Sequence, residues 1–299
     1  MNAAFKHIGE RVLVGSGAAR FARNRLRGRT LVLAYHNVVP NGDVLSGNVN
    51  LHLPQREFAR QLDILVSTHD VVSLSMLLTH SSPSGRPRTI ITFDDAYAGC
   101  LTAGVEELVQ RGLPATIFVP PALLGSTPWW DILAERTSGI VPDRLQRHAL
   151  EALGGHGGRI LRWAQSESDP TAASALPRIG TEAQLKTAAS RPGITLGSHS
   201  WSHPNLCALT DTELEMELTK PLQWLQSRFD AVAPWLSYPY GCFSDSVQNV
   251  AAKVGYVGSL RVDGGWIPAS GPSAHAIPRL NIPYGLSLNG FRLRLAGFS

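Results

Sequence analysis

The sequence predicts an α/β fold built from repeated strand–helix units, and three observations indicate this. Short apolar runs alternate with segments of helical periodicity along most of the chain. Apolar residues make up 43% of the 299 residues and charged residues only 17%, which is typical of a well-buried globular domain and excludes disorder or a coiled coil. The 28 glycines and 20 prolines supply the many turns that such a fold needs.

Seven short apolar segments are the expected strands. In chain order they are Leu31–Tyr35, Thr89–Phe93, Ala115–Val119, Ile194–Gly197, Ala233–Ser237, Tyr256–Leu260 and a last one near Ala276–Ile282. Three helices between them have clear boundary signals. Gln55–Val66 follows Pro54, a good first-turn residue. A capping box at residues 210–213 opens a helix that Pro221 should kink, and another helix starts at Ser244 and ends at Gly255.

Residues 122–190 break this alternation. They contain Trp129 and Trp130, a helical pattern over Asp131–Arg136, a glycine-rich turn at residues 154–158 and a Ser/Ala/Pro stretch to Pro177. We interpret the segment as an insertion over one end of a barrel; a separate small domain is the alternative.

The positive charge of the chain lies almost entirely in residues 1–29, a basic tail with a helical pattern. This tail holds seven Lys or Arg and one acid, net +6, whereas residues 30–299 hold 20 basic and 22 acidic side chains, net −2. The charge therefore does not predict a nucleic-acid-binding fold. One interpretation of the tail is an anchor on an anionic membrane surface. The other is a solvated terminal helix, interrupted by Gly15, Ser16 and Gly17.

The compartment follows from what the sequence does not contain. No run approaches the ~18 apolar residues of a membrane span, and the first residues do not resemble a signal peptide. Three cysteines without paired spacing suit a reducing compartment. We therefore expect a cytoplasmic protein, which the tail could hold at the inner face of the membrane.

Three polar clusters directly follow expected strands. They are Thr92–Asp95, Gly197–His203 and Tyr238–Gly241. The carboxyl ends of parallel strands share one face of an α/β fold, and active sites are assembled there. We therefore expect these clusters to meet.

The residue types in these clusters suit a metal site. Asp94 and Asp95 can take different roles, one on a metal and one on a water molecule; a helix cap beside a solvated acid is the alternative. His199 and His203 are four residues apart and could share the metal. Asp95 with these two imidazoles would suit zinc, although iron accepts the same ligand types. The zincin motif, the Walker A loop and the G-x-S-x-G elbow are absent.

Taken together, the clusters resemble the first three motifs of the polysaccharide deacetylase family. The motifs are Thr-Phe-Asp-Asp at 92–95, His-Ser-x-x-His at 199–203 and Tyr-Pro-Tyr-Gly at 238–241. The resemblance runs from about Leu31 to Ile282 and implies a distorted (β/α) barrel, often of seven strands, over residues 30–299. It also implies a divalent metal, usually zinc, on Asp95, His199 and His203. Asp94 would be the general base, and the Tyr240 backbone N–H would stabilise the oxyanion.

The chain departs from the family pattern at one position of the third motif, and the later motifs, around Asp263–Trp266 and His275–Arg279, match only loosely. Many members carry an arginine two residues before the proline of the third motif, where this chain has Ser237. We expect Arg279, near the end of the last strand, to take that place beside Asp94. His275 is the candidate general acid, with a loop histidine as the alternative. His36, which also ends a strand, is a candidate substrate or supporting residue, with a hydrogen-bonding role in the core as the alternative.

The resemblance implies a hydrolase of carbon–nitrogen bonds other than peptide bonds, a carbohydrate N-deacetylase. Its expected partner is an acetylated glycan or glycan precursor, with an N-acetyl, O-acetyl or formyl group removed; no nucleic acid is expected, and the oligomeric state stays open. A catalytically silent carbohydrate-binding protein that kept the fold is the alternative. A lipid-linked sugar at the membrane surface is a further alternative for the substrate, suggested by the basic tail.

Overall fold

The structure is a computed structural model that describes residues 3–78, 85–166, 176–268, 271 and 273–298. Most of the Ser/Ala/Pro stretch expected before Pro177 lies outside the described residues. No helix in the described ranges combines the length and the apolar character needed to cross a membrane.

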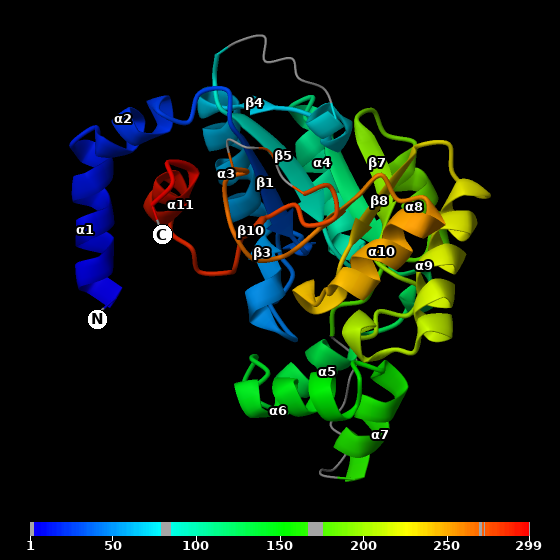
Figure 1. Cartoon of the computed structure of the whole chain (residues 1–299). Coiled ribbons are helices and arrows are strands. Elements are labelled where there is room, and N and C mark those ends of the chain that lie inside the picture. Colours follow the sequence, from blue (N-terminus) through cyan, green and yellow to red (C-terminus); the bar gives the residue numbers. More distant parts are fainter. Residues whose placement is uncertain (1–2, 79–84, 167–175, 269–270, 272, 299) are drawn as a thin grey trace.

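A curled sheet of parallel strands forms the centre of the molecule (Figure 1). Its strands follow the spatial order β10, β1, β5, β6, β7, β8, β9, and β4 pairs with β5 beside this path. A single parallel bridge from Leu260 to Ile277 links β9 to the segment before β10, so the sheet curls toward closure. The expected barrel of seven strands is confirmed. The strands are β1 (Thr30–Tyr35), β4 (Asp70–Val71), β5 (Arg88–Phe93), β6 (Ala115–Val119), β7 (Ile194–Ser198), β8 (Val232–Ser237), β9 (Gly258–Leu260) and β10 (Leu280–Asn281), with a separate parallel pair β2 (Asn37–Val39) and β3 (His52–Pro54).

Helices surround the curled sheet (Figure 1). The capping box at Thr210 and Glu213 forms as expected, and Gly255 ends its helix in a left-handed conformation. The helices are α1 (Ala3–Gly15), α2 (Ala18–Asn24), α3 (Gln55–Thr68), α4 (Val105–Gln110), α5 (Trp129–Glu135), α6 (Asp143–Arg147), α7 (Gly157–Ser166), α8 (Glu182–Ala189), α9 (Asp211–Gln226), α10 (Asp245–Val254) and α11 (Leu288–Leu295).

The side chains that fill the barrel interior are apolar toward the amino ends of the strands and polar toward their carboxyl ends. Ile90, Phe118 and Trp235 belong to one buried cluster inside the barrel, together with Val32, Leu260 and Ile277. Side chains two residues apart on a strand point to the same face. Thr92 and Ser237, two places further along β5 and β8, therefore also face inward, and both are polar and buried. Arg279, two places after Ile277, is buried with them.

Helices α5, α6 and α7 lie together beyond the carboxyl ends of the strands (Figure 1). They share a buried cluster of their own that includes Trp129, Trp130 and Ile160. Helix α8, at the end of the segment, packs instead against β7 as a barrel helix. The part that covers the site is therefore α5 to α7.

Candidate active site

A cavity of about 190 Å³ opens at the carboxyl ends of the strands. The loops after β5, β7 and β8 all contribute to its wall, because the strands are parallel and these loops emerge at the same end. Eight of its lining residues carry the chemistry discussed below: His36, Asp94, Asp95, Trp129, Trp130, His199, His203 and Tyr240. The three polar clusters of the sequence therefore meet, as expected.

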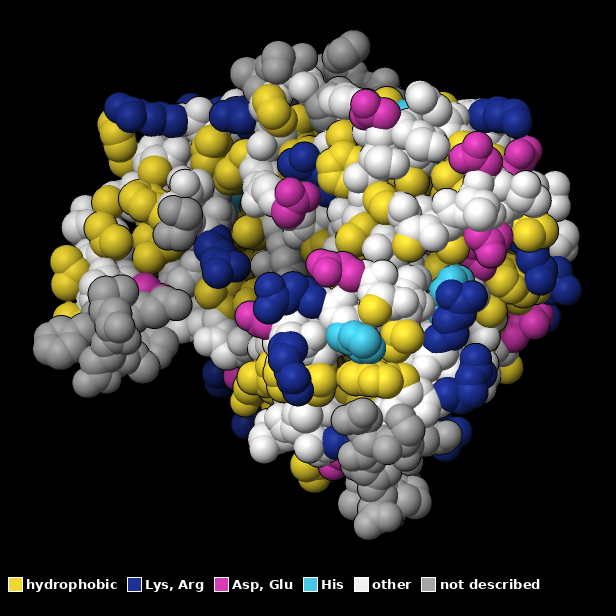
Figure 2. Space-filling view, turned by 60° about the horizontal axis from the view of Figure 1, so that its bottom comes forward, with side chains coloured by type: hydrophobic (Ala, Val, Ile, Leu, Met, Phe, Trp, Pro, Cys, Tyr) yellow, Lys and Arg dark blue, Asp and Glu magenta, His cyan; other side chains and the backbone are white. Residues whose placement is uncertain are grey.

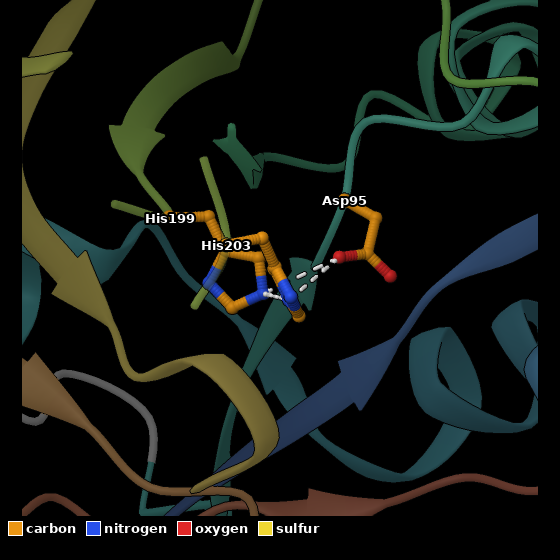
Figure 3. A group of neighbouring side chains, drawn as sticks. All are labelled: Asp95, His199 and His203. Carbon is orange, nitrogen blue, oxygen red and sulfur yellow. Dashed lines mark hydrogen bonds and ion pairs between the residues drawn. The ribbon is translucent and has the colours of Figure 1, made fainter. Parts of the chain in front are cut away.

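Asp95, His199 and His203 converge on one point of this cavity (Figure 3). Asp95 Oδ1 lies 3.2 Å from His203 Nε2 and 3.4 Å from His199 Nε2, and the two nitrogen atoms are 3.1 Å apart. A tetrahedral zinc site with bonds of about 2.0–2.1 Å has ligand atoms about 3.3 Å apart. The three distances therefore match three corners of such a site, and the fourth corner is left for water or substrate.

A hydrogen bond to the Ser237 backbone fixes the orientation of the His199 ring. Its Nδ1 atom lies 2.8 Å from the Ser237 carbonyl oxygen, which can only accept, so Nδ1 carries the proton and Nε2 presents a lone pair to the centre. Asp95 Oδ1 is buried and has no regular hydrogen-bond partner among the described residues. Such an orphaned acceptor facing two imidazoles fits a cation.

The pKa values of the triad reflect competition between burial and close contact. Burial alone raises the pKa of Asp95, but the two imidazoles outweigh this effect, so the pKa is lowered. Burial lowers the pKa of His203, and the neighbouring His199 adds to this effect. His199 is also buried, but Asp94 and Asp95 more than compensate and raise its pKa. The triad thus supplies a carboxylate and at least one neutral imidazole as ligands.

Asp94 forms a fully buried pair with Arg279. The Arg279 Nη1 and Nη2 atoms donate to Asp94 Oδ1 and Oδ2 at 2.8 and 2.7 Å, and Arg279 is 0% exposed. The guanidinium also donates to Ser237 Oγ at 2.8 Å, to Thr92 Oγ1 at 3.1 Å and to the Arg261 carbonyl at 2.7 Å. Burial raises the pKa of Asp94, but Arg279 outweighs it and lowers the pKa to about 2. The guanidinium thus lies beside both Asp94 and Ser237, as the missing family arginine required.

Backbone strain is concentrated in the loops after β5, β7 and β8, which carry the site residues. Of the six non-glycine residues with positive φ in the described ranges, five lie here, with φ between 55° and 68°: Asp95, Ala96, Ser200, His203 and Tyr240. Each such conformation costs of order 1–3 kcal/mol and persists only when its surroundings enforce it. The Tyr240 backbone, expected as the oxyanion donor, is one of these enforced positions.

Glu217 of α9 holds the histidine loop in place. Its carboxylate accepts hydrogen bonds from the Trp201 and Ser202 backbone N–H groups at 3.0 and 2.8 Å and from Ser202 Oγ at 2.7 Å. Ser200 Oγ accepts from the His203 N–H at 3.0 Å. The sequence analysis missed Glu217, since a glutamate in the middle of an amphipathic helix gives no local signal.

The tryptophans of α5 form the wall next to His203. Trp129 Nε1 donates to Tyr240 Oη at 3.0 Å, and the Trp130 ring lies 4.8 Å from the His203 ring. Both tryptophans are only 5% exposed, so they seat α5 against the site and leave little surface for stacking on a sugar.

Asp131, directly after these tryptophans, fixes α5 to the barrel. It accepts from Tyr97 Oη at 2.6 Å and from the Asn48 N–H at 2.8 Å, and His52 Nε2 lies 2.9 Å from it. Trp130 Nε1 in turn donates to Tyr97 Oη at 2.7 Å. Asp131 was also missed, because its partners are scattered over distant segments.

The two remaining histidines are placed differently from each other. His275 does not line the cavity, and its Nδ1 atom lies 3.0 Å from Ser259 Oγ, so the structure does not bring it to the other site residues. His36 joins β1 to β2 and lines the cavity beside Asp94 and Asp95. Burial lowers the pKa of His36, opposed by the two carboxylates.

The parallel α/β barrel carries an Asp-His-His triad next to a buried Asp–Arg pair. This arrangement is typical of hydrolases that use a bound metal ion. The family model of polysaccharide deacetylase matches residues 81–259. The chain belongs to the polysaccharide deacetylase family.

Relatives and solved structures agree with this assignment. YxkH of Bacillus subtilis (strain 168), named as a polysaccharide deacetylase, is 22% identical over 264 residues, 87% of this chain and 74% of that protein. The deacetylase PplD of Streptococcus pyogenes, solved with acetate, superposes with a TM-score of 0.63 at 17% identity, covering 89% of this chain and 98% of PplD. IcaB from Ammonifex degensii gives 0.62 at 15% identity, with 90% and 96% covered. These two structures support the fold.

Proposed function

We propose that this protein is a metal-dependent deacetylase that hydrolyses the N-acetyl group of a sugar in a glycan or glycan precursor. The observation that carries the proposal is the ligand triad, with spacings that fit zinc, next to an arginine-paired carboxylate in one cavity. Catalytic silence has less support, because a binding protein has no need to keep both the ligands and the base.

The residues divide the chemistry between them. Asp95, His199 and His203 would hold a divalent metal, and such a metal would supply polarisation of the acyl carbonyl and a more acidic water molecule. Asp94 accepts the proton of the attacking water, and Arg279 keeps that carboxylate ionised and fixed in direction. The Tyr240 N–H donates to the oxyanion that develops as the carbonyl carbon becomes tetrahedral.

The leaving amine needs a proton, and we assign its delivery to His36 in place of His275. His36 is the cavity imidazole outside the triad, and its lowered pKa keeps it neutral. A neutral imidazole both accepts and donates, so it can pass on the proton released by the water. The carbon–nitrogen bond then breaks to give acetate and the free amino sugar.

The test measures bound metal and released acetate on the same samples, with N-acetylated oligosaccharides as substrates. Asp94→Asn should keep one equivalent of zinc and lose at least about 10²-fold in kcat, because the base is replaced while the three proposed ligands stay. Asp43→Asn, an exposed loop position, is the matched control and should behave as wild type. Zinc-loaded protein that binds glycan but releases no acetate would instead establish the silent binding protein.

A further inference from the structure

Helices α1 and α2 form an arm on one side of the barrel, packed against α11 (Figure 1). The buried side of the arm is well fitted. Glu10 accepts a hydrogen bond from Ser287 Oγ at 2.5 Å, at the start of α11, and Ala19 packs with Leu293 and Ala296. The arm is therefore packed on the barrel and is not a free solvated tail. Its outer side faces away from α11.

The outer side of the arm exposes large apolar side chains. Ile8 and Val12, one helical turn apart, are 58% and 63% exposed, and Phe21 of α2 is 62% exposed. Leu13 is 40% exposed. Figure 2 shows apolar side chains gathered along the edge of the molecule where α1 lies. A helix pair that is apolar on both its packed and its outer side indicates a second contact.

Arginines follow these apolar side chains along the arm, and the Arg25 guanidinium lies 4.6 Å from the centre of the Phe21 ring. Arg20, Arg23 and Arg27 line a hollow with Arg86, and none of the three forms an ion pair with a described acidic residue. Arg86 is the member of the hollow with an acid beside it, Asp70, whose Oδ1 atom lies 3.6 Å from Arg86 Nε. Burial and then the neighbouring Arg20, Arg292 and Arg86 lower the pKa of Arg23, which shows how closely the positive charges crowd.

We propose that the α1–α2 arm docks this protein on an anionic membrane surface, with its arginines on lipid headgroups and its outer apolar side chains at the acyl boundary. Apolar side chains beside unneutralised arginines are the pattern of an interfacial helix. Residues 1–29 carry net +6 and residues 30–299 carry net −2, so most of the excess positive charge lies in and directly after the arm. A nucleic acid would use the arginines but leave the apolar side chains in water.

The arm also sets which way the catalytic cavity faces. The arginine hollow includes Gly28 and Pro87, at the amino ends of β1 and β5, whereas the cavity lies at the carboxyl ends of the strands. Headgroup contact at the hollow therefore lies at the opposite ends of the strands from the cavity. A glycan that extends away from the bilayer fits this orientation better than one buried at the headgroups.

Co-sedimentation with lipid vesicles tests the proposal. The full chain should bind vesicles of phosphatidylcholine with one quarter phosphatidylglycerol, and should neither bind pure phosphatidylcholine nor stay bound at high salt. Each arginine near an anionic surface contributes roughly fivefold in binding constant, so Arg20→Gln with Arg27→Gln should weaken binding roughly 25-fold. Ile8→Ser with Val12→Ser should also release the protein.

The matched control carries Arg144→Gln, Arg147→Gln and Ile140→Ser, which replace exposed residues of the same kinds on the insertion. It should bind vesicles like wild type, and all variants should keep their acetate release from soluble oligosaccharides. Equal binding to neutral vesicles, or unchanged binding of both arm variants, overturns the proposal. So does an arm variant that changes only the oligomeric state, because the surface is then an interface between copies of this chain.

Discussion

Replacing Arg279 by serine removes the guanidinium that pairs with Asp94, the proposed base. Asp94 is 2% exposed and receives two charged hydrogen bonds from Arg279, so the replacement leaves a buried carboxylate without its partner. Removing one member of a buried pair costs about 3–5 kcal/mol. We expect Arg279→Ser to lower the free energy of unfolding by that amount and kcat by at least about 10²-fold.

The pH dependence of stability should change sign at the same time. In the wild type, the pKa of Asp94 falls from its ordinary 3.8 to about 2, so its contribution is present above pH 3.8 and is lost as the pH falls toward 2. That contribution is about 2–3 kcal/mol, at about 1.4 kcal/mol per pH unit. Burial is the largest single effect on this pKa, so we expect the loss of Arg279 to raise the Asp94 pKa, and the metal-free variant should then gain stability from Asp94 as the pH falls from neutral toward 4.

Moving the arginine to position 237 provides the decisive control. Arg279 Nη2 lies 2.8 Å from Ser237 Oγ, and Ser237 is fully buried. Ser237→Arg should therefore destabilise the wild type, where the space is filled, but restore part of the stability and kcat of Arg279→Ser. The measurements are denaturant unfolding and acetate release over the four-member cycle. A Ser237→Arg effect of the same size and sign in both backgrounds would refute the reasoning.

Three other predictions concern support around the site and the fold. Glu217→Ala should weaken zinc binding about 10–100-fold, measured by competition with a chelator, because it frees the histidine loop; unchanged affinity would contradict this role. Asp131→Ala should expose α5 to proteolysis and lower the free energy of unfolding by about 1–3 kcal/mol, since buried donors lose their acceptor; an intact α5 after digestion would count against it. Burial and the nearby Arg23 and Arg86 lower the pKa of His69 to about 4. As the pH falls, His69 is protonated near pH 6.5 in the unfolded chain but only near pH 4 in the folded protein. The free energy of unfolding should therefore fall by up to about 3 kcal/mol between pH 6.5 and 4. His69→Gln should lose this pH dependence in denaturant titrations.

The barrel could be predicted because strand periodicity is a local signal. Ala115–Val119 was predicted to the residue, and the other central strands differ by one or two residues. The last strand was predicted over Ala276–Ile282 but forms only at Leu280–Asn281. Pro278 has no N–H to donate to a sheet, which limits this edge to the single bridge at Ile277.

The meeting of Asp94, Asp95, His199 and His203 in one cavity could be predicted because each follows its strand within a few residues. Residues that act from a distance could not. His275 is four residues from Arg279, yet a hydrogen bond to Ser259 keeps it away from the cavity. Glu217 and Asp131 reach the site only through folded packing, which no spacing in the sequence encodes.

The pairing of Asp94 with Arg279 has a consequence for how the chain is made. The two residues are 185 positions apart. At about 5–20 residues per second, a ribosome needs about 10–40 seconds to add that stretch. During this interval the nascent barrel has to keep Asp94 in water, because no counter-charge exists for it yet. The last segment synthesised therefore decides when the interior can close, and a nascent chain waiting for it presents open strand edges to chaperones.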